Sequence, residues 1–361
     1  MSDIRYWTGL SLVPDIGPIT ARQLISRTGS PEHVFSLDLQ DLLSVQGMTR
    51  GRAENILNFS GWDAVDRQTR ILEQKGISVI CYGTPEYPEV LKEIPDAPAV
   101  IYSKGSYRPD DRFGIAVVGS RAYSPYGQTV TQKISGELAA AGITIISGMA
   151  RGIDTFAHRS ALASGGRTIA VLGSGIDVCY PSENRGLMDK IADSGCFMSE
   201  FPPGTPPNRE NFLRRNRLIS GLSLGVLVVE AAEDSGSLIT ASIALEQNRE
   251  LFAVPGNITT KNSAGANLLI RQGAKVVTKS SDIIEELAPV LKGFIRDETK
   301  RNVELSSGEQ AVCACLSGEP KHIDTLARES GLPVHRILDI LLSLELKGVI
   351  RQSDGKRFYL A

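Results

Sequence analysis

Residues 144–163 read TIISGMARGIDTFAHRSALA, and this short stretch contains three kinds of segment in succession. The apolar run 144–146 predicts a buried strand, residues 147–154 predict a glycine-containing loop, and residues 154–163 predict a helix. A strand that passes through a tight loop into a helix is the repeating unit of a parallel α/β sheet.

The same unit recurs on both sides of this stretch. Further short Val/Ile-rich runs predict strands at 115–118, 168–172, 196–198, 226–229, 251–254 and 275–277, with helices at 127–141 and 238–247 among the intervening segments. Unbroken apolar strands separated by helices are typical of a parallel sheet that is covered on both faces. Residues 63–290 are therefore predicted to form an extended, doubly wound Rossmann-like domain, with an additional strand at 76–82.

A helical domain is predicted before the sheet, at residues 1–62. Residues 13–24 and 45–57 each contain a glycine turn followed by a helix, which resembles a tandem helix-hairpin-helix or SAM-like fold. The turn amides of such hairpins can bind a DNA phosphate. A helical packing or protein-interaction module remains the alternative.

The end of the chain has a different pattern. Residues 291–306 are polar and charged and predict a linker. Residues 307–361 predict helices at 309–316, 322–330 and 333–347, followed by two β segments around Ser353-Asp354-Gly355, which together indicate a winged helix. This fold usually binds DNA. Because its third helix carries only Arg336 and Lys347 among apolar and acidic residues, protein contact is an equally good interpretation.

Composition limits the possible functions only loosely. The net charge is −2, so a nucleic-acid partner would require locally clustered basic residues. The five cysteines and four histidines show no metal-ligand spacing, and scattered thiols suit a reducing cytosol. With no signal-peptide pattern and no membrane-spanning run, we expect a cytoplasmic protein without a membrane partner or a metal.

The loops after the strands are the candidate site. In an open parallel sheet, ligands bind at the carboxyl ends of the strands. These loops combine glycines, hydroxyl side chains and helix N-termini, which suits phosphate binding. The predicted nucleic-acid-binding residues are Gly119, Ser120, Arg121, Ser147, Gly148, Arg151, Gly173, Gly175, Tyr180, Phe212, Arg214, Arg215, Asn216, Arg217, Ser235, Gly236, Ser237 and Thr240.

The arginines carry most of this prediction. Residues 211–217, NFLRRNR, form the densest basic patch and include the aromatic Phe212. Guanidinium groups bind phosphates, and Arg or Phe can stack on unpaired bases. The alternative for one or two of the five arginines is an ion pair with Glu200, Glu210 or Glu230 that holds the loops.

Two enzyme classes are the alternatives to this interpretation. Residues 173–178 begin like a dinucleotide fingerprint but have Val178 at the third glycine position, which argues against a nicotinamide cofactor. A hydrolase could use Glu200 with Glu230, or Asp154 with His158, as acid and base. The favoured interpretation is that Asp154 caps a helix and that His158 packs against it.

Taken in order, these motifs resemble the DprA/Smf family. They are Gly-Ser-Arg at 119–121, Ser-Gly-Met-Ala-Arg-Gly-Ile-Asp at 147–154, Gly-Ser-Gly-Ile-Asp at 173–177, Ser-Glu-Phe-Pro at 199–202, Arg-Asn-Arg at 215–217, Ser-Gly-Ser-Leu-Ile-Thr-Ala at 235–241 and Val-Pro-Gly at 254–256. The flanking domains fit too, so the resemblance spans nearly the whole chain. Leu213 and Thr84 are small departures from the family pattern.

The resemblance implies a DNA-processing protein that is not an enzyme and needs no cofactor. It implies a homodimer that binds single-stranded DNA, protects it, and loads the RecA recombinase in natural transformation and homologous recombination. The implied DNA contacts are Arg121, Arg215 and Arg217 with Arg214 beside them, and the implied dimer contact is the apolar run Leu268, Leu269 and Ile270. The alternative function is a nucleotide phosphoribohydrolase-like enzyme on the same scaffold, which the absence of an acid between Thr240 and Glu246 weakens.

Overall fold

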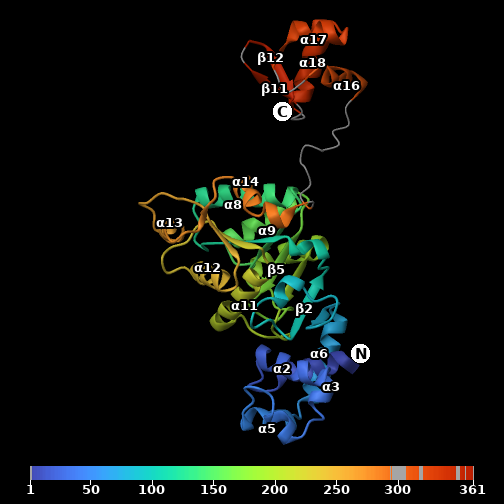
Figure 1. The fold of residues 1–361 in the computed structure, drawn as a ribbon, viewed down its shortest axis with the longest axis vertical. Coiled ribbons are helices and arrows are strands. Elements are labelled where there is room, and N and C mark those ends of the chain that lie inside the picture. The colour runs from blue at the N-terminus through green and yellow to red at the C-terminus, as the bar shows by residue number, and fades with distance from the viewer. Residues whose placement is uncertain are drawn as a thin grey trace. The chain divides into compact units, whose positions relative to one another are not determined.

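The computed structural model describes residues 2–292, 294, 306–316, 320–346, 350–353 and 355–360. The chain divides into two compact units, residues 1–296 and residues 297–361, which are described separately (Figure 1). Among the described helices, none is long and apolar enough to cross a bilayer.

The N-terminal part of the first unit is helical, as predicted. Its helices are α1 (Ser2–Leu12), α2 (Pro18–Thr28), α3 (Pro31–Val34), α4 (Leu39–Leu43), α5 (Arg50–Leu57) and α6 (Trp62–Gln74). Both predicted hairpins are helix–turn–helix pairs: α2 begins directly after Gly17, and the turn before α5 contains Gly47 at a positive φ of 75°. Trp7 and Leu24 share one hydrophobic cluster with Tyr102 and Phe197 of the sheet. The helical region therefore packs onto the sheet and completes its core.

The sheet has nine strands in the order β1-β2-β6-β5-β4-β3-β7-β8-β9. They are β1 (Ser78–Cys81), β2 (Val100–Gly105), β3 (Gly114–Val118), β4 (Thr144–Ser147), β5 (Thr168–Leu172), β6 (Cys196–Ser199), β7 (Gly225–Val228), β8 (Glu250–Ala253) and β9 (Lys275–Val276). The seven strands from β6 to β9 are parallel, which confirms the predicted fold class. The strand β2, which runs antiparallel to both β1 and β6, was not predicted.

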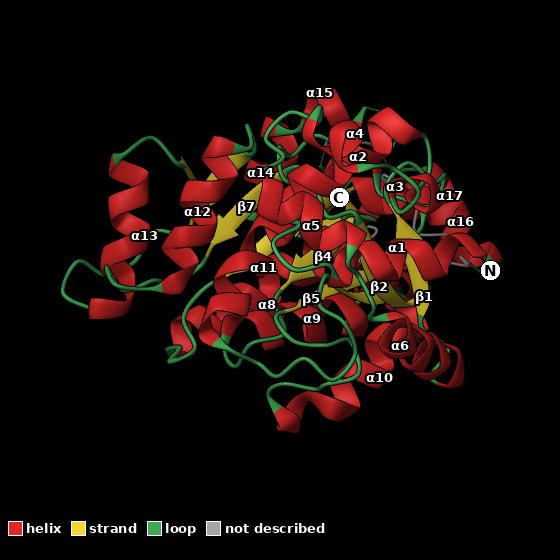
Figure 2. Cartoon of the chain, turned by 90° about the horizontal axis from the view of Figure 1, so that it is seen from below, coloured by secondary structure: helices red, strands yellow, loops and turns green. Residues whose placement is uncertain are grey.

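Helices cover both faces of the sheet. They are α7 (Glu89–Lys92), α8 (Pro125–Ala140), α9 (Ile153–Ala163), α10 (Arg185–Ser194), α11 (Arg209–Gly221), α12 (Gly236–Glu246), α13 (Lys261–Arg271), α14 (Ser280–Glu286) and α15 (Ala288–Leu291), with short 3-10 turns at Pro109–Arg112 and Ser182–Asn184. Figure 2 shows β1 and β2 at one end of the sheet and α13 at the other.

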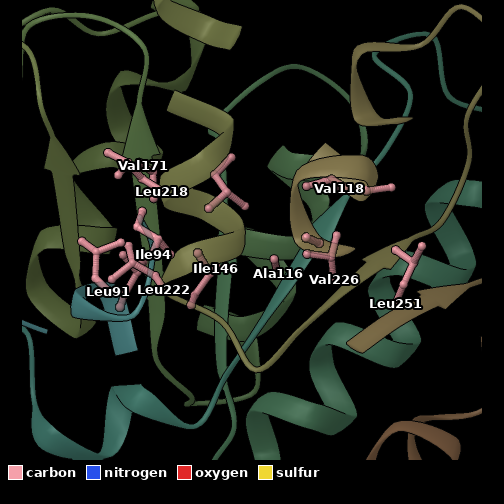
Figure 3. Close-up of a cluster of buried hydrophobic side chains, with 14 of the residues drawn as sticks. Leu91, Ile94, Ala116, Val118, Ile146, Val171, Leu218, Leu222, Val226 and Leu251 are labelled. Carbon is pink, nitrogen blue, oxygen red and sulfur yellow. The ribbon is translucent and has the colours of Figure 1, made fainter. Parts of the chain in front are cut away.

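Alternation along β3 shows how the two layers form. Ala116 and Val118 pack with Leu218 of α11 and with Leu222, which directly follows that helix, whereas Ile115 and Val117 belong to the cluster beneath α8 and α9. Figure 3 shows the first of these clusters, in which Leu218 lies near Val171. Side chains of a strand alternate between faces, so a strand buried on both faces has no polar position. This is the physical reason for the unbroken apolar runs in the sequence.

The chain reverses direction across the sheet at β3. The strands β3, β4, β5 and β6 follow one another in one direction, whereas β7 pairs with the other edge of β3 and β8 and β9 continue outward. Neighbouring crossover helices therefore lie on opposite faces, and a crevice opens at the carboxyl ends of β3 and β7. This switch point positions the candidate site.

The second unit contains α16 (Ser307–Ala314), β10 (Lys321–His322), α17 (Ile323–Ser330), α18 (Val334–Leu346), β11 (Ile350–Ser353) and β12 (Arg357–Leu360). Its three strands pair in the order β10-β12-β11, and Leu326, Ile337, Leu341 and Phe358 form its core. Three helices with a small sheet are the arrangement that the winged-helix prediction required. Most of the predicted linker, together with Lys347 and Asp354, lies outside the described residues.

Candidate functional site

A cleft of about 870 Å³ lies at the switch point, and we call it the switch-point cleft. Its walls are the end of β3 with residues 119–122, one face of α11, the first turns of α12 and α13, and single residues that include Ala150, Asp154 and Tyr180. Loops from distant parts of the sequence therefore meet at one edge of the sheet, as predicted.

The Gly119-Ser120-Arg121 loop is fixed by its backbone. The amide of Ser120 donates to the carbonyl of Glu230 at 2.7 Å, and the carbonyl of Ser120 accepts from the amide of Ile153 at 3.3 Å. Gly152 permits this close approach because it has a positive φ of 77°, and a Cβ at this position would meet Ser120 and Arg121. With its backbone held at two points, the loop presents the exposed Arg121 to the cleft.

Phe212 is the aromatic centre of the cleft. The Arg121 guanidinium lies 5.6 Å from the Phe212 ring centroid, and the Tyr180 ring lies 5.5 Å away at 40°. Gly173 lies directly behind Phe212, and a Cβ at this position would overlap the ring. Gly173 thus acts by making room for Phe212, while the half-exposed Tyr180 leaves part of its ring open to the cleft.

Arg215 forms the floor of the cleft as a buried cation. Its Nη1 donates to the carbonyl of Gly148 at 2.7 Å and also to the carbonyl of Val171. Burial lowers the pKa of Arg215 to about 10, so the guanidinium remains protonated at neutral pH. Burial also raises the pKa of Asp154, whose carboxylate accepts the amides of Gly148 and Ala150. Arg215 therefore contributes positive potential from below. Asp154 was predicted to cap a helix, but Gly152 holds the N-cap position of α9, and the Asp154 carboxylate instead fixes the loop that precedes the helix.

The arginines of α11 point to two different sides of the helix. Arg209, Phe212, Arg215 and Asn216 line the cleft. Arg217 instead lies on the other side of the helix, where its Nη2 pairs with Glu200 Oε1 at 2.5 Å and its Nε pairs with Asp96 at 3.2 Å.

Arg214 lies on the same side of α11 as Arg217, near Glu200. Its Nη2 lies 3.8 Å from Glu200, and its guanidinium lies over the ring of Phe201. Neither arginine lines the cleft. Residues three or four apart share a helix face, so adjacent arginines cannot all point the same way. This geometry corrects the expectation that the whole Arg-Arg-Asn-Arg segment faces the ligand, and it matches the alternative of an ion pair with Glu200.

Five other predicted residues also lie outside the cleft lining. Ser147 is buried and donates to the carbonyl of Val117 at 2.7 Å, Gly148 lies behind Arg215, and Arg151 pairs with Glu183 at the surface. The remaining two are Gly173 and Gly175, which provide close backbone packing. These residues shape the site without facing its ligand.

The start of α12 supplies hydroxyl groups, as predicted. Ser235, Gly236, Ser237 and Thr240 all line the cleft, and Ser235 caps the helix by accepting the amide of Ser237 at 3.3 Å. A helix N-terminus carries a partial positive charge that favours anions.

Two cations of the cleft were not predicted. Arg209 and Lys261 are exposed, and among the described residues neither has a carboxylate partner. Arg209 could have been found by helical spacing, because it lies three residues before Phe212. Lys261 lies 140 residues after Arg121 in the sequence, so only the tertiary structure places it here.

The side chains considered as acid and base of a hydrolase are engaged in other contacts within the protein. Glu200 is held by Arg217, and both carboxylate oxygens of Glu230 accept hydrogen bonds from Ser124. His158 is fully buried against Thr168, and burial lowers its pKa to about 3. Within the described part of the chain, no three His, Cys, Asp or Glu residues gather as metal ligands.

The predicted dimer segment lies mostly in the core. Leu269 is buried in the main hydrophobic cluster, and Ile270 packs against that cluster, so these two side chains stabilise α13 within the subunit. Leu268 is half-buried and remains a candidate contact.

Comparison with known proteins gives a consistent picture. The sequence profile of the family described as DNA recombination-mediator protein A matches residues 78–288, and the profile of the DprA winged helix domain matches residues 296–356. Protein Smf of Escherichia coli K12 is 37% identical over 98% of this chain and 95% of its own length. The DNA processing protein DprA of Bacillus subtilis is 44% identical over 59% of this chain and 72% of its own length.

Two solved structures share the fold. DNA processing protein A of Streptococcus pneumoniae superposes with a TM-score of 0.67 at 35% identity, over 78% of this chain and 96% of that chain. The protein of the same name from Helicobacter pylori, whose structure was described for its single-stranded DNA binding mode, gives a TM-score of 0.54 at 29% identity. It covers 59% of this chain and 96% of that chain.

Proposed function

This chain belongs to the DprA/Smf family of DNA processing proteins, and we propose that it binds single-stranded DNA in the switch-point cleft without catalysing a reaction. The observation that carries the proposal is the pairing of cations with an aromatic centre: Arg121 and Arg209 are exposed beside Phe212, and neither has a carboxylate partner among the described residues. The cations can bind the phosphates of a strand, and unpaired bases can stack on an aromatic ring.

The structure supports different roles for the arginines than the family resemblance implies. Arg121 and Arg209 contact phosphates, Arg215 supplies charge from the floor, and a base stacks on Tyr180 beside Phe212. Duplex DNA is disfavoured because its bases are already stacked and paired, so they cannot enter the cleft. The hydroxyl groups and amides at the start of α12 complete the phosphate site.

A salt titration tests this proposal. Binding of the full chain to a single-stranded oligonucleotide is compared with binding to the same sequence as duplex, for the wild type, Arg121→Ala, Arg209→Ala and Arg214→Ala. Each lost phosphate contact lowers the log–log salt slope by about 0.7 on single strands. We expect this decrease for the Arg121 and Arg209 variants. Arg214→Ala is the matched control, since it removes an arginine from the same helix on the face away from the cleft.

Two results would contradict the proposal. A wild-type protein without preference for the single strand would exclude the cleft as a base-binding site. An unchanged slope for Arg121→Ala and Arg209→Ala, together with a lower slope for Arg214→Ala, would place the strand on the opposite face of α11.

The cellular role that we propose follows from the family. The chain acts as a homodimer in the cytoplasm, protects incoming single strands and loads RecA on them during transformation and homologous recombination. This is tested by measuring RecA-dependent ATP hydrolysis on single strands precoated with a single-strand-binding protein. Addition of the wild-type chain should shorten the lag before hydrolysis, and Arg121→Ala should restore it. A lag that the wild-type chain leaves unchanged would refute the loading role.

A further inference from the structure

A second cleft, of about 680 Å³, adjoins the first. It lies between the start of α8, the loop after β8 and the start of α13, and we call it the α8–α13 cleft. Lys261 and Asn262 line both clefts. Asn262 also donates from Nδ2 to the carbonyl of Ala122, directly after Arg121, at 2.5 Å. The two clefts therefore meet at the first turn of α13.

Tyr126 gives the α8–α13 cleft an open aromatic face. Its hydroxyl donates to the carbonyl of Pro255 at 2.8 Å, which anchors the far end of the side chain. The residue nevertheless remains 49% exposed. A ring that is held at its tip and open on its face loses little conformational entropy when a base stacks on it.

The charges around this cleft suit an anionic strand. Lys261 is exposed and has no carboxylate partner among the described residues. The carboxylate of Glu230 also lines the cleft, but the residue is only 3% exposed and both oxygens accept hydrogen bonds from Ser124. The other polar residues of the lining are uncharged. Among the described residues of this lining, a phosphate therefore meets one free cation and no free carboxylate.

We propose that a single strand bound in the switch-point cleft continues into the α8–α13 cleft. Lys261 binds a phosphate at the junction of the two clefts, and Tyr126 stacks a base beyond it. This proposal rests on the proposed function, because it extends the same strand by a second subsite. Basic side chains that alternate with stacking rings are the arrangement by which proteins bind single strands without reading their sequence.

Affinity for oligothymidylates of graded length tests the second subsite. Lengths from roughly four to sixteen nucleotides span the site sizes of compact single-strand-binding folds. The variants are Tyr126→Ala, Tyr126→Phe and Lys261→Gln in the full chain. Tyr123→Ala and Lys190→Gln are matched controls, because they change an exposed tyrosine and an exposed lysine that line neither cleft.

Length dependence is the expected result. Wild-type affinity should rise with length until both clefts are filled. Tyr126→Ala should weaken binding of long oligonucleotides about tenfold, the loss of one stacked base, and leave the shortest ones unchanged. Tyr126→Phe should retain long-strand affinity. Lys261→Gln should lower the salt slope by about 0.7 on long strands. Because the Lys261 side chain makes no hydrogen bond or ion pair with another described residue, this variant tests the proposal even if Tyr126→Ala is unstable.

The outcomes separate the two proposals. If the wild-type chain binds no single strand of any length, the proposed function fails and the second subsite fails with it. If binding is strong but Tyr126→Ala and Lys261→Gln have wild-type length profiles, only the second subsite is refuted. If Tyr126→Ala changes the oligomeric state in light scattering and leaves the length profile intact, the cleft is a contact between copies of the chain, and the proposal is equally overturned.

Discussion

Replacing Arg217 by alanine should destabilise the protein and leave its affinity for single-stranded DNA unchanged. The side chains of Arg217 and Glu200 are only 10% and 9% exposed, and their closest atoms lie 2.5 Å apart. Removal of one member of a buried pair leaves an uncompensated charge, which costs about 3–5 kcal/mol. The lower half of this range applies here, because Arg214 lies 3.8 Å from the same oxygen of Glu200.

Urea denaturation followed by tryptophan fluorescence measures this loss. The two tryptophans, Trp7 and Trp62, both belong to the first compact unit, so the signal reports on that unit alone. At a slope of about 2–3 kcal/mol/M, a loss of about 3–4 kcal/mol moves the midpoint down by about 1–2 M. Single-strand affinity should be measured well below the new midpoint.

A double variant separates the loss of the ion pair from other effects. Arg217→Met with Glu200→Leu replaces the pair by apolar side chains of similar size, which is often neutral or stabilising. We expect it to recover most of the lost stability. An unchanged midpoint for Arg217→Ala, with a large loss of DNA affinity, would refute the assignment of Arg217 to the fold and return it to the DNA site.

Three further predictions concern single residues. Burial lowers the pKa of His158 to about 3 in the folded chain, against about 6.5 in the unfolded chain, so between these values the unfolded state binds one more proton. The free energy of unfolding should therefore fall as the pH drops through this window, by at most about 4–5 kcal/mol. His158→Gln should flatten the dependence of the urea midpoint on pH. Gly173→Ala should displace Phe212 and weaken single-strand binding about tenfold or more, seen by anisotropy, with unaltered affinity as the refuting result. Burial raises the pKa of the Cys196 thiol to about 12, so this thiol should resist Ellman's reagent at pH 8 in the native chain. The partly exposed Cys179 should react under the same conditions. Equal reaction rates of the two thiols would contradict the buried placement of Cys196.

The sequence was sufficient to predict the seven parallel strands and the helices at 127–141, 154–163 and 238–247, whereas α10, α11 and α13 were not predicted. The strands at Ile115–Val118 and Thr168–Leu172 are almost entirely apolar because both of their faces are buried. Such a run of apolar residues can be recognised from the sequence of the strand alone. The glycine-rich loops likewise marked the correct edge of the sheet. The strand at Val100–Gly105 was missed, since the prolines around it obscured a short run and one of its two partners, β6, lies far away in the sequence.

The roles of the arginines depended on the tertiary structure. In the sequence, Arg214, Arg215 and Arg217 form one basic patch; in the fold, Arg215 points under the cleft while Arg214 and Arg217 turn towards Glu200. Whether a guanidinium binds phosphate or a carboxylate depends on which group lies within a few ångströms, because charge interactions weaken with distance and with solvent exposure. Those neighbours come from other strands and helices, and Lys261 joins the site for the same reason. Periodicity within a segment can therefore predict the elements and the edge where a ligand binds, but the charge partners are chosen by packing between segments.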